Sequence, residues 1–390
     1  MIKYPYSRPV VTKEDREAVS KALKKQFLTG GEVIKSFEKK ISNEFEVKNA
    51  IVCNSGTAAL HLIYNALGLK EGDALLTSPI TFVATANAAR MCNAQVVFAD
   101  TDPNTGLLTP ESIEAAIKSS KLRIKVITVV HLGGRLCDLE AIAKVAKKYK
   151  CLLVEDACHA PGATYLNIKK KGSKVGSCRY SVACSFSFHA IKHITMAEGG
   201  CVTTNNLKLA KEIRNKLNHG MIKNKDKSFL DPWYYNVKEL GWNYRASELN
   251  CALGLNQLKR LKELLKRRKE IAYEYKKQLG KVNYISFPKN SFNKNTNAWH
   301  LFTILIDLKF LKIKKRDIVN KLEKKGIGTQ VHYIPIFLQP YYKNTFNAKF
   351  EGSLTYYTKS LSLPMYVSLK KNDIKYICES LNNILKRYAK

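Results

Sequence analysis

Short apolar runs alternate with helix-like segments between residues 50 and 205, and this alternation restricts the possible folds more than any other feature. Strand-like runs occur at 50–54, 74–78, 94–100, 124–131, 151–157, 182–188 and 200–205. Segments with apolar residues every three or four positions lie between several of them. The pattern predicts an α/β fold with a mostly parallel, seven-stranded sheet covered by helices on both faces. The last two runs are too close for a helical crossover, so at least one neighbouring pair is expected to be antiparallel.

The character of the chain changes after Asn206. The expected elements are a helix at 209–217, an irregular segment at 218–250, a long helix at 248–279, a strand near 299–307, a helix near 315–326 and a strand near 326–333. Long irregular segments in compact domains are usually functional or disordered, and the aromatic residues in this one favour a function. We therefore expect a large domain over residues 1–250, which includes the N-terminal segment, and a smaller C-terminal α+β domain with the long helix over residues 251–390.

Composition and cysteine spacing exclude several classes of protein. The chain has 390 residues, 45% of them hydrophobic, yet no apolar stretch is long enough to cross a bilayer. Its first residues lack the apolar core of a secretory signal. Ten cysteines occur without a C-x-x-C pair, which disfavours structural zinc. We expect a cytoplasmic protein with reduced thiols, no membrane segment and no metal site.

The net charge of +34 raises the question of a nucleic-acid partner. The lysines are spread along the whole chain, and no basic motif of a known nucleic-acid-binding fold accompanies them. A lysine-rich surface on solvated helices explains this distribution better than a nucleic-acid interface. The charge is also compatible with a small anionic substrate.

Three features fall at the ends of predicted strands, where open α/β sheets bind their ligands. The first is the turn 54–60, NSGTAAL, between a strand and a helix. A small turn at a helix start leaves backbone N–H groups that suit a phosphate. The alternative is an ordinary helix cap by Ser55 or Thr57.

The second feature is the acid pair Glu155–Asp156 at the end of a buried run, which is costly unless each acid has a partner. Asp156 could hold a protonated ring nitrogen, bind a metal or cap the following turn. The third is Lys192, which lies between two predicted strands. A desolvated lysine can form a Schiff base and then move a proton. The alternative is a lysine whose stem is buried while its amine reaches water.

Together, a phosphate turn, a buried acid and a buried lysine indicate a site for pyridoxal 5′-phosphate. The phosphate needs a helix start, the ring nitrogen needs a carboxylate, and the aldehyde needs an amine. This interpretation uses all three features at once, whereas each alternative explains only one of them.

The chain resembles the DegT/DnrJ/StrS family of sugar-nucleotide aminotransferases over nearly its whole length. The motifs that carry the resemblance are FLTGG (27–31), NSGTAAL (54–60), SPITFVATANAA (78–89), VEDACHAPGA (154–163), SFSFHAIKHITMAEGG (185–200), NHGM (218–221), LGWNYRASELNCALGLNQL (240–258) and QVHYIPI (330–336). The resemblance implies the fold type I, aspartate aminotransferase-like architecture and a homodimer with shared active sites.

The resemblance also assigns roles to single residues. It implies that Lys192 binds the cofactor aldehyde and that Asp156 faces the pyridine nitrogen. The further cofactor contacts that it implies are Phe82 on the ring face, His159 near the phenolic oxygen, Gly56, Thr57, Ala58 and Ser187 on the phosphate, and Asn243 of a neighbouring subunit on the phosphate.

The expected substrates are glutamate, as the amino donor, and a keto-sugar nucleotide. The motifs SFHAIK, AEGG, HGM, QVHY and SLSLPMY resemble the transaminases of pseudaminic acid synthesis, which implies amination at C4 of a UDP-linked 4-keto-6-deoxy sugar. His193 and Met196 depart from that pattern. Residues expected to bind the sugar nucleotide are Thr29, Gly30, Tyr234, Tyr235, His332 and Tyr333. Amination at C3, a dTDP-linked sugar, the opposite stereochemistry at C4 and, more distantly, a DNA-binding regulator on the same fold stay open as alternatives.

Overall fold

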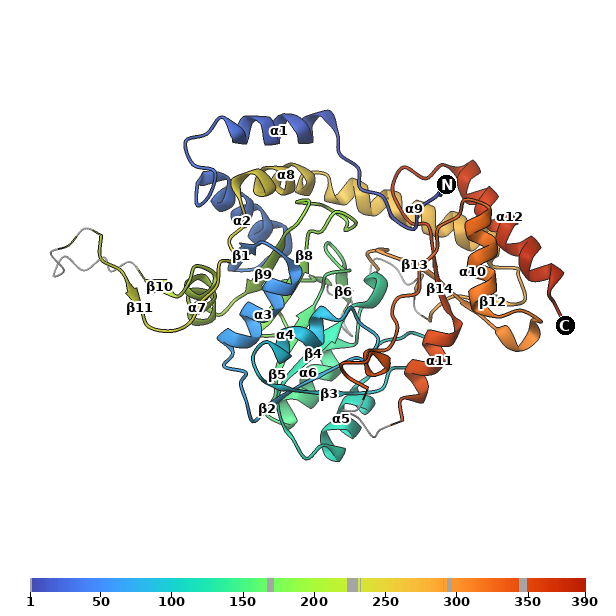
Figure 1. Cartoon of the computed structure of the whole chain (residues 1–390), viewed down its shortest axis with the longest axis horizontal. Helices are drawn as coiled ribbons and strands as arrows, with labels where there is room; N and C mark the ends of the chain where they lie inside the picture. Colours follow the sequence, from blue (N-terminus) through green and yellow to red (C-terminus); the bar gives the residue numbers. More distant parts are fainter. Residues whose placement is uncertain are drawn as a thin grey trace.

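A seven-stranded sheet forms the centre of the larger part of the molecule (Figure 1). The computed structural model describes residues 2–166, 172–222, 231, 233–289, 291–292, 297–343 and 349–390. In spatial order the strands are β1 (Asn49–Cys53), β9 (Gly200–Thr204), β8 (Ala183–Ser187), β5 (Leu152–Asp156), β4 (Arg123–Val130), β2 (Asp73–Thr77) and β3 (Gln95–Phe98). All seven predicted strands are present. Strand β9 runs antiparallel to both of its neighbours and the other pairs are parallel, so the expectation of an antiparallel pair is confirmed.

The sheet is buried on both faces, as the continuous apolar runs predict. Successive residues of β1 alternate between two hydrophobic clusters: Ala50 and Val52 belong to one, Ile51 and Cys53 to the other. One face is covered by α3 (Gly56–Ala66), α4 (Ala84–Arg90) and α7 (Leu207–Leu217). The opposite face is covered by α2 (Glu32–Phe45), α5 (Pro110–Ser119), α6 (Leu139–Lys148) and α8 (Glu248–Leu258). The α/β fold class is therefore confirmed.

The predicted long helix over 248–279 is two helices, α8 and α9 (Leu261–Leu279), so the prediction of one continuous helix was wrong. The break falls at Lys259 and Arg260. A guanidinium nitrogen of Arg260 lies 2.6 Å from a carboxylate oxygen of Asp15, which is fully buried on α1 (Lys13–Leu23). Figure 1 shows α1 lying alongside α8. This buried ion pair fixes the N-terminal helix against the break.

The C-terminal part is built on a three-stranded antiparallel sheet of β12 (Ile285–Ser286), β13 (Phe302–Ile306) and β14 (Ser360–Leu363). Its helices are α10 (Lys315–Lys324), α11 (Glu351–Lys359) and α12 (Lys371–Arg387). A third hydrophobic cluster fills it and includes Tyr4 from the N-terminal segment. The predicted boundary at residue 250 falls within α8 and stays a prediction.

The predicted strand near 326–333 does not form. Gln330 makes a single antiparallel bridge with Ser362, after which the chain turns to bring Tyr333 to within 3.2 Å of His159. The element beside β13 is instead β14, which the sequence analysis missed. Shorter elements are the 3₁₀ turns Leu132–Gly134, Leu308–Phe310 and Ile336–Leu338 and the two-stranded ribbon of β6 (Thr164–Leu166) and β7 (Gly172–Lys174).

The predicted irregular segment contains a short antiparallel pair, β10 (Met221–Ile222) and β11 (Asn236–Val237). This hairpin projects from the body of the molecule (Figure 1). Much of the predicted loop, residues 223–230 and 232, lies outside the described residues. Within the described residues, no helix combines the length and apolar character that a membrane span requires.

Candidate active site

The predicted phosphate turn is the capped start of α3, and the end of strand β8 packs closely against it. Ser55 caps α3, because its hydroxyl oxygen accepts a hydrogen bond from the Ala58 N–H at 3.0 Å. The N–H of Ala58 is therefore already used. The N–H groups of Gly56 and Thr57 belong to the first turn of the helix, where no intrahelical acceptor exists. They are the donors that this turn offers to an anion.

Gly56 allows strand β8 to approach this helix start. A Cβ atom at Gly56 would lie 2.8 Å from the Cβ of Ser187 and 3.4 Å from the sulfur of Cys158. A real Cβ does not tolerate the first distance, so any other residue would push Ser187 away. The small residue therefore creates a cradle between the first turn of α3 and the Ser187 side chain.

Asp156 ends β5 as a buried acid with two hydrogen-bond donors. One carboxylate oxygen accepts a bond from the Thr85 hydroxyl at 2.8 Å, and the other accepts from the Cys158 N–H at 3.2 Å. The Thr85 hydroxyl in turn lies 2.9 Å from the hydroxyl of Thr81, which precedes α4. Sequence reasoning missed Thr85.

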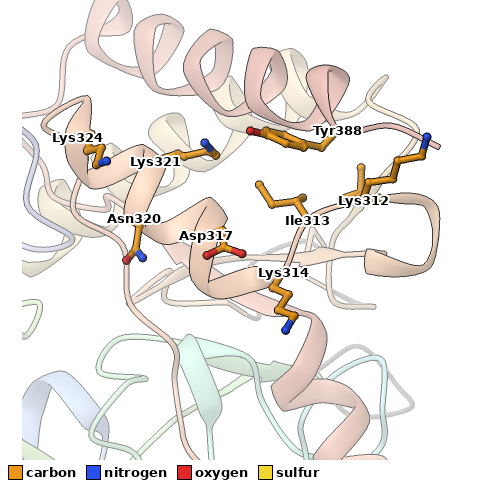
Figure 2. Close-up of a pocket in the computed structure, with 9 residues that line it drawn as sticks. Lys312, Ile313, Lys314, Asp317, Asn320, Lys321, Lys324 and Tyr388 are labelled. Carbon is orange, nitrogen blue, oxygen red and sulfur yellow. The ribbon is translucent and has the colours of Figure 1, made fainter.

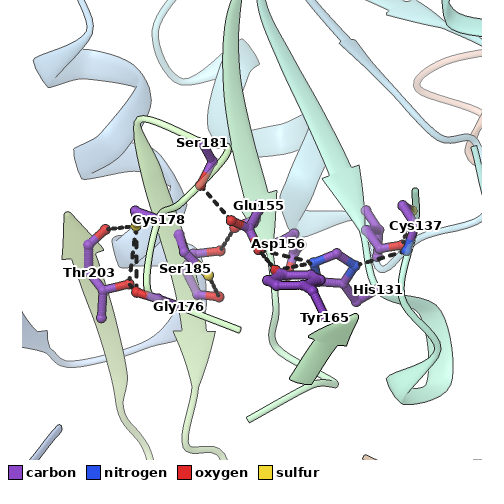
Figure 3. Close-up of polar contacts among 12 residues, drawn as sticks. His131, Cys137, Glu155, Asp156, Tyr165, Gly176, Cys178, Ser181, Ser185 and Thr203 are labelled. Atoms are coloured by element: carbon purple, nitrogen blue, oxygen red, sulfur yellow. Dashed lines mark hydrogen bonds and ion pairs between the residues drawn. The ribbon is translucent and has the colours of Figure 1, made fainter. Parts of the chain in front are cut away.

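Glu155, the other acid of the pair, has a separate set of partners (Figure 3). Its carboxylate accepts hydrogen bonds from the hydroxyls of Ser181 and Tyr165 and lies 3.2 Å from Nε2 of His131. Because Nδ1 of His131 accepts a hydrogen bond from the Cys137 N–H, the ring proton is on Nε2, which donates a hydrogen bond to Glu155. Both buried acids are thus partnered, as the sequence analysis required, and only Asp156 lies beside the phosphate turn.

Lys192 lies in the connection between β8 and β9, next to Asp156 and Cys158. Burial lowers the pKa of the Lys192 amine from its ordinary value. The neighbouring Cys158 and Asp156 oppose this shift, whereas the Arg268 guanidinium adds to it. Lys192 is partly buried, and its amine loses its proton more readily than that of a solvated lysine.

His159 and Tyr333 join the two parts of the molecule at the site. Nδ1 of His159 accepts a hydrogen bond from the Gly133 N–H at 3.2 Å, so the neutral ring carries its proton on Nε2. Nε2 then donates to the Tyr333 hydroxyl oxygen at 3.2 Å. Burial lowers the pKa of His159 well below its ordinary value and keeps the ring neutral.

Phe82 and His332 lie around this pair. The ring of Phe82 is 6.0 Å from that of Tyr333 and remains 57% exposed, which leaves a face open to a planar ligand. His332 is hydrogen-bonded to Ser362 at 2.9 Å, and burial lowers its pKa to about 3. Tyr6, which the sequence analysis did not single out, has its ring 5.7 Å from that of His332.

The other predicted site residues lie on different elements. Thr29 forms a bridge with Ser247, and Gly30 has a left-handed φ of 69° with open space where a side chain would be. Tyr234 and Tyr235 lie beside β11 and are partly exposed. Asn243 is exposed, and its backbone oxygen accepts a hydrogen bond from the side chain of Asn54 at 3.4 Å.

A buried acid on α8, Glu248, holds the FLTGG turn in place. Its carboxylate accepts hydrogen bonds from the N–H groups of Gly31, Val33 and Ile34 at 3.0, 2.8 and 3.2 Å. These are donors at the start of α2, which has no side-chain cap of its own. The sequence analysis missed Glu248, because its partners lie more than 200 positions away.

Two cavities lie away from the site. The first, of about 680 Å³, lies beside α10 and Tyr388 and is lined by Lys312, Lys314, Lys321 and Lys324 (Figure 2). The second, of about 630 Å³, lies near Arg135 and Tyr165. Neither is lined by Lys192 or Asp156. Among the residues that the structure describes, no group of three or more His, Cys, Asp or Glu side chains could hold a metal ion.

The residues around Lys192 fit pyridoxal 5′-phosphate. The cradle between Gly56 and Ser187 offers backbone and hydroxyl donors to a phosphate, and Asp156 offers a carboxylate to a protonated ring nitrogen. The partly exposed Phe82 ring and the depressed pKa of Lys192 suit the ring face and the aldehyde. Each chemical group of the cofactor thus has a matching partner in one chain.

Comparison with known proteins identifies the family of the chain. The profile of the DegT/DnrJ/EryC1/StrS aminotransferase family matches residues 9–382. The chain is 37% identical over 388 residues to the spore coat polysaccharide biosynthesis protein SpsC of Bacillus subtilis, covering 98% of this chain and 97% of that protein. It is 38% identical over 386 residues to a Campylobacter jejuni protein named UDP-4-amino-4,6-dideoxy-N-acetyl-beta-L-altrosamine transaminase, covering 99% and 98%.

The fold is also similar to that of solved structures from this group of enzymes. The solved structure of Helicobacter pylori PseC, described as an aminotransferase involved in the biosynthesis of pseudoaminic acid, superposes with a TM-score of 0.90 at 34% identity. The match covers 99% of this chain and 100% of that one, which confirms the fold type I architecture. The chain belongs to the DegT/DnrJ/EryC1/StrS family of pyridoxal 5′-phosphate-dependent sugar aminotransferases.

Proposed function

We propose that this enzyme moves an amino group from glutamate to C4 of a UDP-linked 4-keto-6-deoxy-2-acetamido sugar. Membership of the family establishes that the chain is a sugar aminotransferase. The identity of the amino donor, of the sugar and of the aminated carbon is what we propose. The observation that carries it is the full-length similarity to the Campylobacter jejuni transaminase. The name of that protein describes a sugar with an amino group at C4 and no hydroxyl at C6, whose keto precursor has the chemistry stated here.

In this proposal Lys192 and Asp156 carry out the chemistry. Bound pyridoxal 5′-phosphate supplies an aldehyde that takes up amino groups and a ring that takes up electrons. Lys192 would bind the aldehyde carbon of the cofactor, and its free amine would remove a proton from the α-carbon of the bound glutamate. The lowered pKa of Lys192 suits this role, because only the uncharged amine accepts a proton. Asp156 keeps the ring nitrogen protonated.

The remaining cofactor contacts are assigned from their positions. Gly56, Thr57 and Ser187 donate to the phosphate, and Ala58, whose N–H is already bound by Ser55, forms the turn behind them. Phe82 covers one face of the ring. His159, neutral and with its proton on Nε2, lies near the phenolic oxygen.

A second copy of the chain completes the site in this proposal. Asn243 is exposed and would reach the phosphate of the neighbouring subunit. Large apolar side chains near Thr29 and Asn243 are exposed in the single chain: Phe27 at 60%, Trp233 at 75% and Leu240 at 74%. Exposed apolar surface of this kind is typical of protein interfaces and supports a homodimer.

The sugar nucleotide is proposed to bind between the two subunits. His332 and Tyr333 lie on the cofactor side of the small domain, where they can donate hydrogen bonds to the sugar. Thr29, Gly30, Tyr234 and Tyr235 are assigned to the nucleotide part, with backbone donors in the FLTGG turn and aromatic faces on the hairpin.

All ten cysteines are free thiols, which supports a reducing, cytoplasmic location.

A panel of keto-sugar nucleotides tests the substrate proposal. The sugars are generated in place by dehydratases and are offered with glutamate as donor, and mass spectrometry and NMR identify the carbon that gains nitrogen and its configuration. We expect C4 amination of the UDP-linked, acetamido-bearing 4-keto sugar. Amination at C3, or activity only with dTDP-linked sugars that lack the acetamido group, would reject this substrate while leaving the aminotransferase assignment intact.

A further inference from the structure

Four aromatic rings lie in a row that begins at the residue after Lys192, and two of the three neighbouring pairs are stacked. The ring of His193, the next residue along the chain, has its centroid 5.4 Å from that of His300. His300 lies 4.2 Å from His159 at an interplanar angle of 29°, and His159 lies 6.1 Å from Tyr333 at 20°. His159 is therefore held between two rings, and His300 is the closer one. The sequence analysis gave His300 no role.

The backbone that carries His300 is tied to the large domain on several sides. The N–H groups of Ala298 and Leu301 donate to the carbonyl oxygens of Gly134 and Gly133. Gly133 is the same residue whose N–H binds Nδ1 of His159. One short loop thus orients His159 through its ring nitrogen and His300 through the backbone beside it.

Two buried side chains hold the same segment from the other direction. Nε2 of His193 donates to the Ala298 carbonyl oxygen at 2.7 Å. A guanidinium nitrogen of Arg268 donates to the carbonyl oxygens of Trp299 and His300 at 3.1 and 3.3 Å. Trp299 itself has a left-handed φ of 52°, a conformation that costs free energy for an aromatic residue and persists only where the surroundings enforce it.

His300 is buried with one ring nitrogen unpaired: the residue is only 3% exposed, and its Nδ1 has no hydrogen-bond partner among the described residues. A buried polar atom without a partner destabilises the fold. A phenylalanine would fill the same space and keep a flat ring against His159 without this cost, so the contact with His159 needs the ring and not its nitrogens.

The surroundings of His159 require it to be neutral. Lys192 and His193, from the connection between β8 and β9, face His159, as does Arg135 from the loop after β4. His300, which precedes β13, and His332 and Tyr333, which follow α10, face it from the C-terminal part. Protonation of both stacked imidazoles would place two positive charges about 4 Å apart. Burial lowers the pKa of His300 as well as that of His159.

We propose that His300 is a positioning residue for the cofactor site: its ring packs on His159, excludes water from it and holds it in the neutral form that donates to Tyr333. The inference deepens the proposed function, since it rests on His159 lying beside the cofactor. His300 acts only through His159.

The test compares His300→Ala and His300→Gln, which lack a flat ring, with His300→Phe, which keeps one. The absorbance of the cofactor in each holoenzyme is titrated from about pH 5 to 9 without any sugar. Loss of the ring admits water, so the pKa of His159 rises toward the ordinary histidine value of about 6.5. We expect a new titration step at or below that pH in the Ala and Gln variants only, with at least about tenfold weaker cofactor binding.

The Phe variant and an unrelated buried histidine serve as controls. His300→Phe should keep the wild-type titration and unfold at the wild-type temperature or above, because it removes the unpaired nitrogen. His61, which is also buried with an unpaired ring nitrogen and packs against Trp242, should give a wild-type titration as His61→Phe. The inference is wrong if folded Ala and Gln variants titrate like the wild type, or if the Phe variant titrates like them. A wild-type protein that binds no cofactor would instead overturn the proposed function.

Discussion

At the scale of single residues, neighbouring side chains of the same type have different surroundings. Glu155 and Asp156 are consecutive on β5, and strand geometry sends their side chains to opposite faces of the sheet. Glu155 is enclosed by Ser181, Tyr165 and His131, whereas Asp156 accepts hydrogen bonds from Thr85 and the Cys158 N–H. The first arrangement stabilises the fold, and the second leaves the acid at the edge where the cofactor is proposed to bind.

Asp156→Asn should therefore separate cofactor chemistry from folding. The amide cannot keep a ring nitrogen protonated, so we expect kcat to fall by about 100-fold or more while cofactor binding is partly retained. Steady-state kinetics and cofactor absorbance provide the measurement. Glu155→Gln is the matched comparison: it should lower the unfolding temperature and leave the cofactor spectrum unchanged. Near-normal turnover in Asp156→Asn would remove this residue from the mechanism.

The sequence predicted some site residues and could not predict others. Lys192 and Asp156 stand out because a cation and an acid follow apolar runs, where such residues are rare. Thr85 and Glu248 give no such signal, because polar residues on helices are usually solvated. Their roles arise from contacts across 71 and 217 positions. His300 follows a tryptophan at the start of an apolar run and resembles an ordinary core residue until the structure places it against His159.

At the scale of elements, hydrophobic periodicity predicted the strands of the large sheet. It failed where tertiary contacts determine where a helix or strand begins or ends. All seven strands of the large sheet were predicted, because strands buried on both faces are continuous apolar runs. The break between α8 and α9 was missed, because the expected helical pattern continues through Arg260, whereas the ion pair between Arg260 and Asp15 joins residues far apart in the chain. The expected strand near 326–333 did not form, because Ile327 and Gln330 each make an isolated bridge, with Tyr4 and Ser362, and not a continuous ladder.

At the scale of the whole molecule, the single chain provides a cofactor cradle but leaves part of the predicted site at a distance. Asp156 and Ser187 end the adjacent strands β5 and β8, Lys192 lies in the connection after β8, and Gly56 begins α3 beside Ser187. Asn243 and the FLTGG turn lie on other elements and are exposed. A two-fold dimer that pairs these surfaces would complete two equivalent sites, which is why oligomerisation belongs to the proposed function.

Mixing two inactive variants tests whether the sites are shared. A heterodimer of Lys192→Ala and Asn243→Ala chains contains one site with both residues intact, so equal mixing should restore about one quarter of wild-type activity. Activity is measured after subunit exchange has been verified with differently tagged chains. Each variant alone provides the baseline. If exchange is complete and activity stays at that baseline, Asn243 does not act across an interface.

The most direct test of the central claim is to locate the bound cofactor chemically. The purified holoenzyme is reduced with borohydride, digested and mapped by mass spectrometry, with Lys192→Ala treated in parallel. The account predicts that the reduced phosphopyridoxyl group lies on Lys192 alone and is absent from the variant. A label on any other lysine, or an equal label in Lys192→Ala, would contradict it.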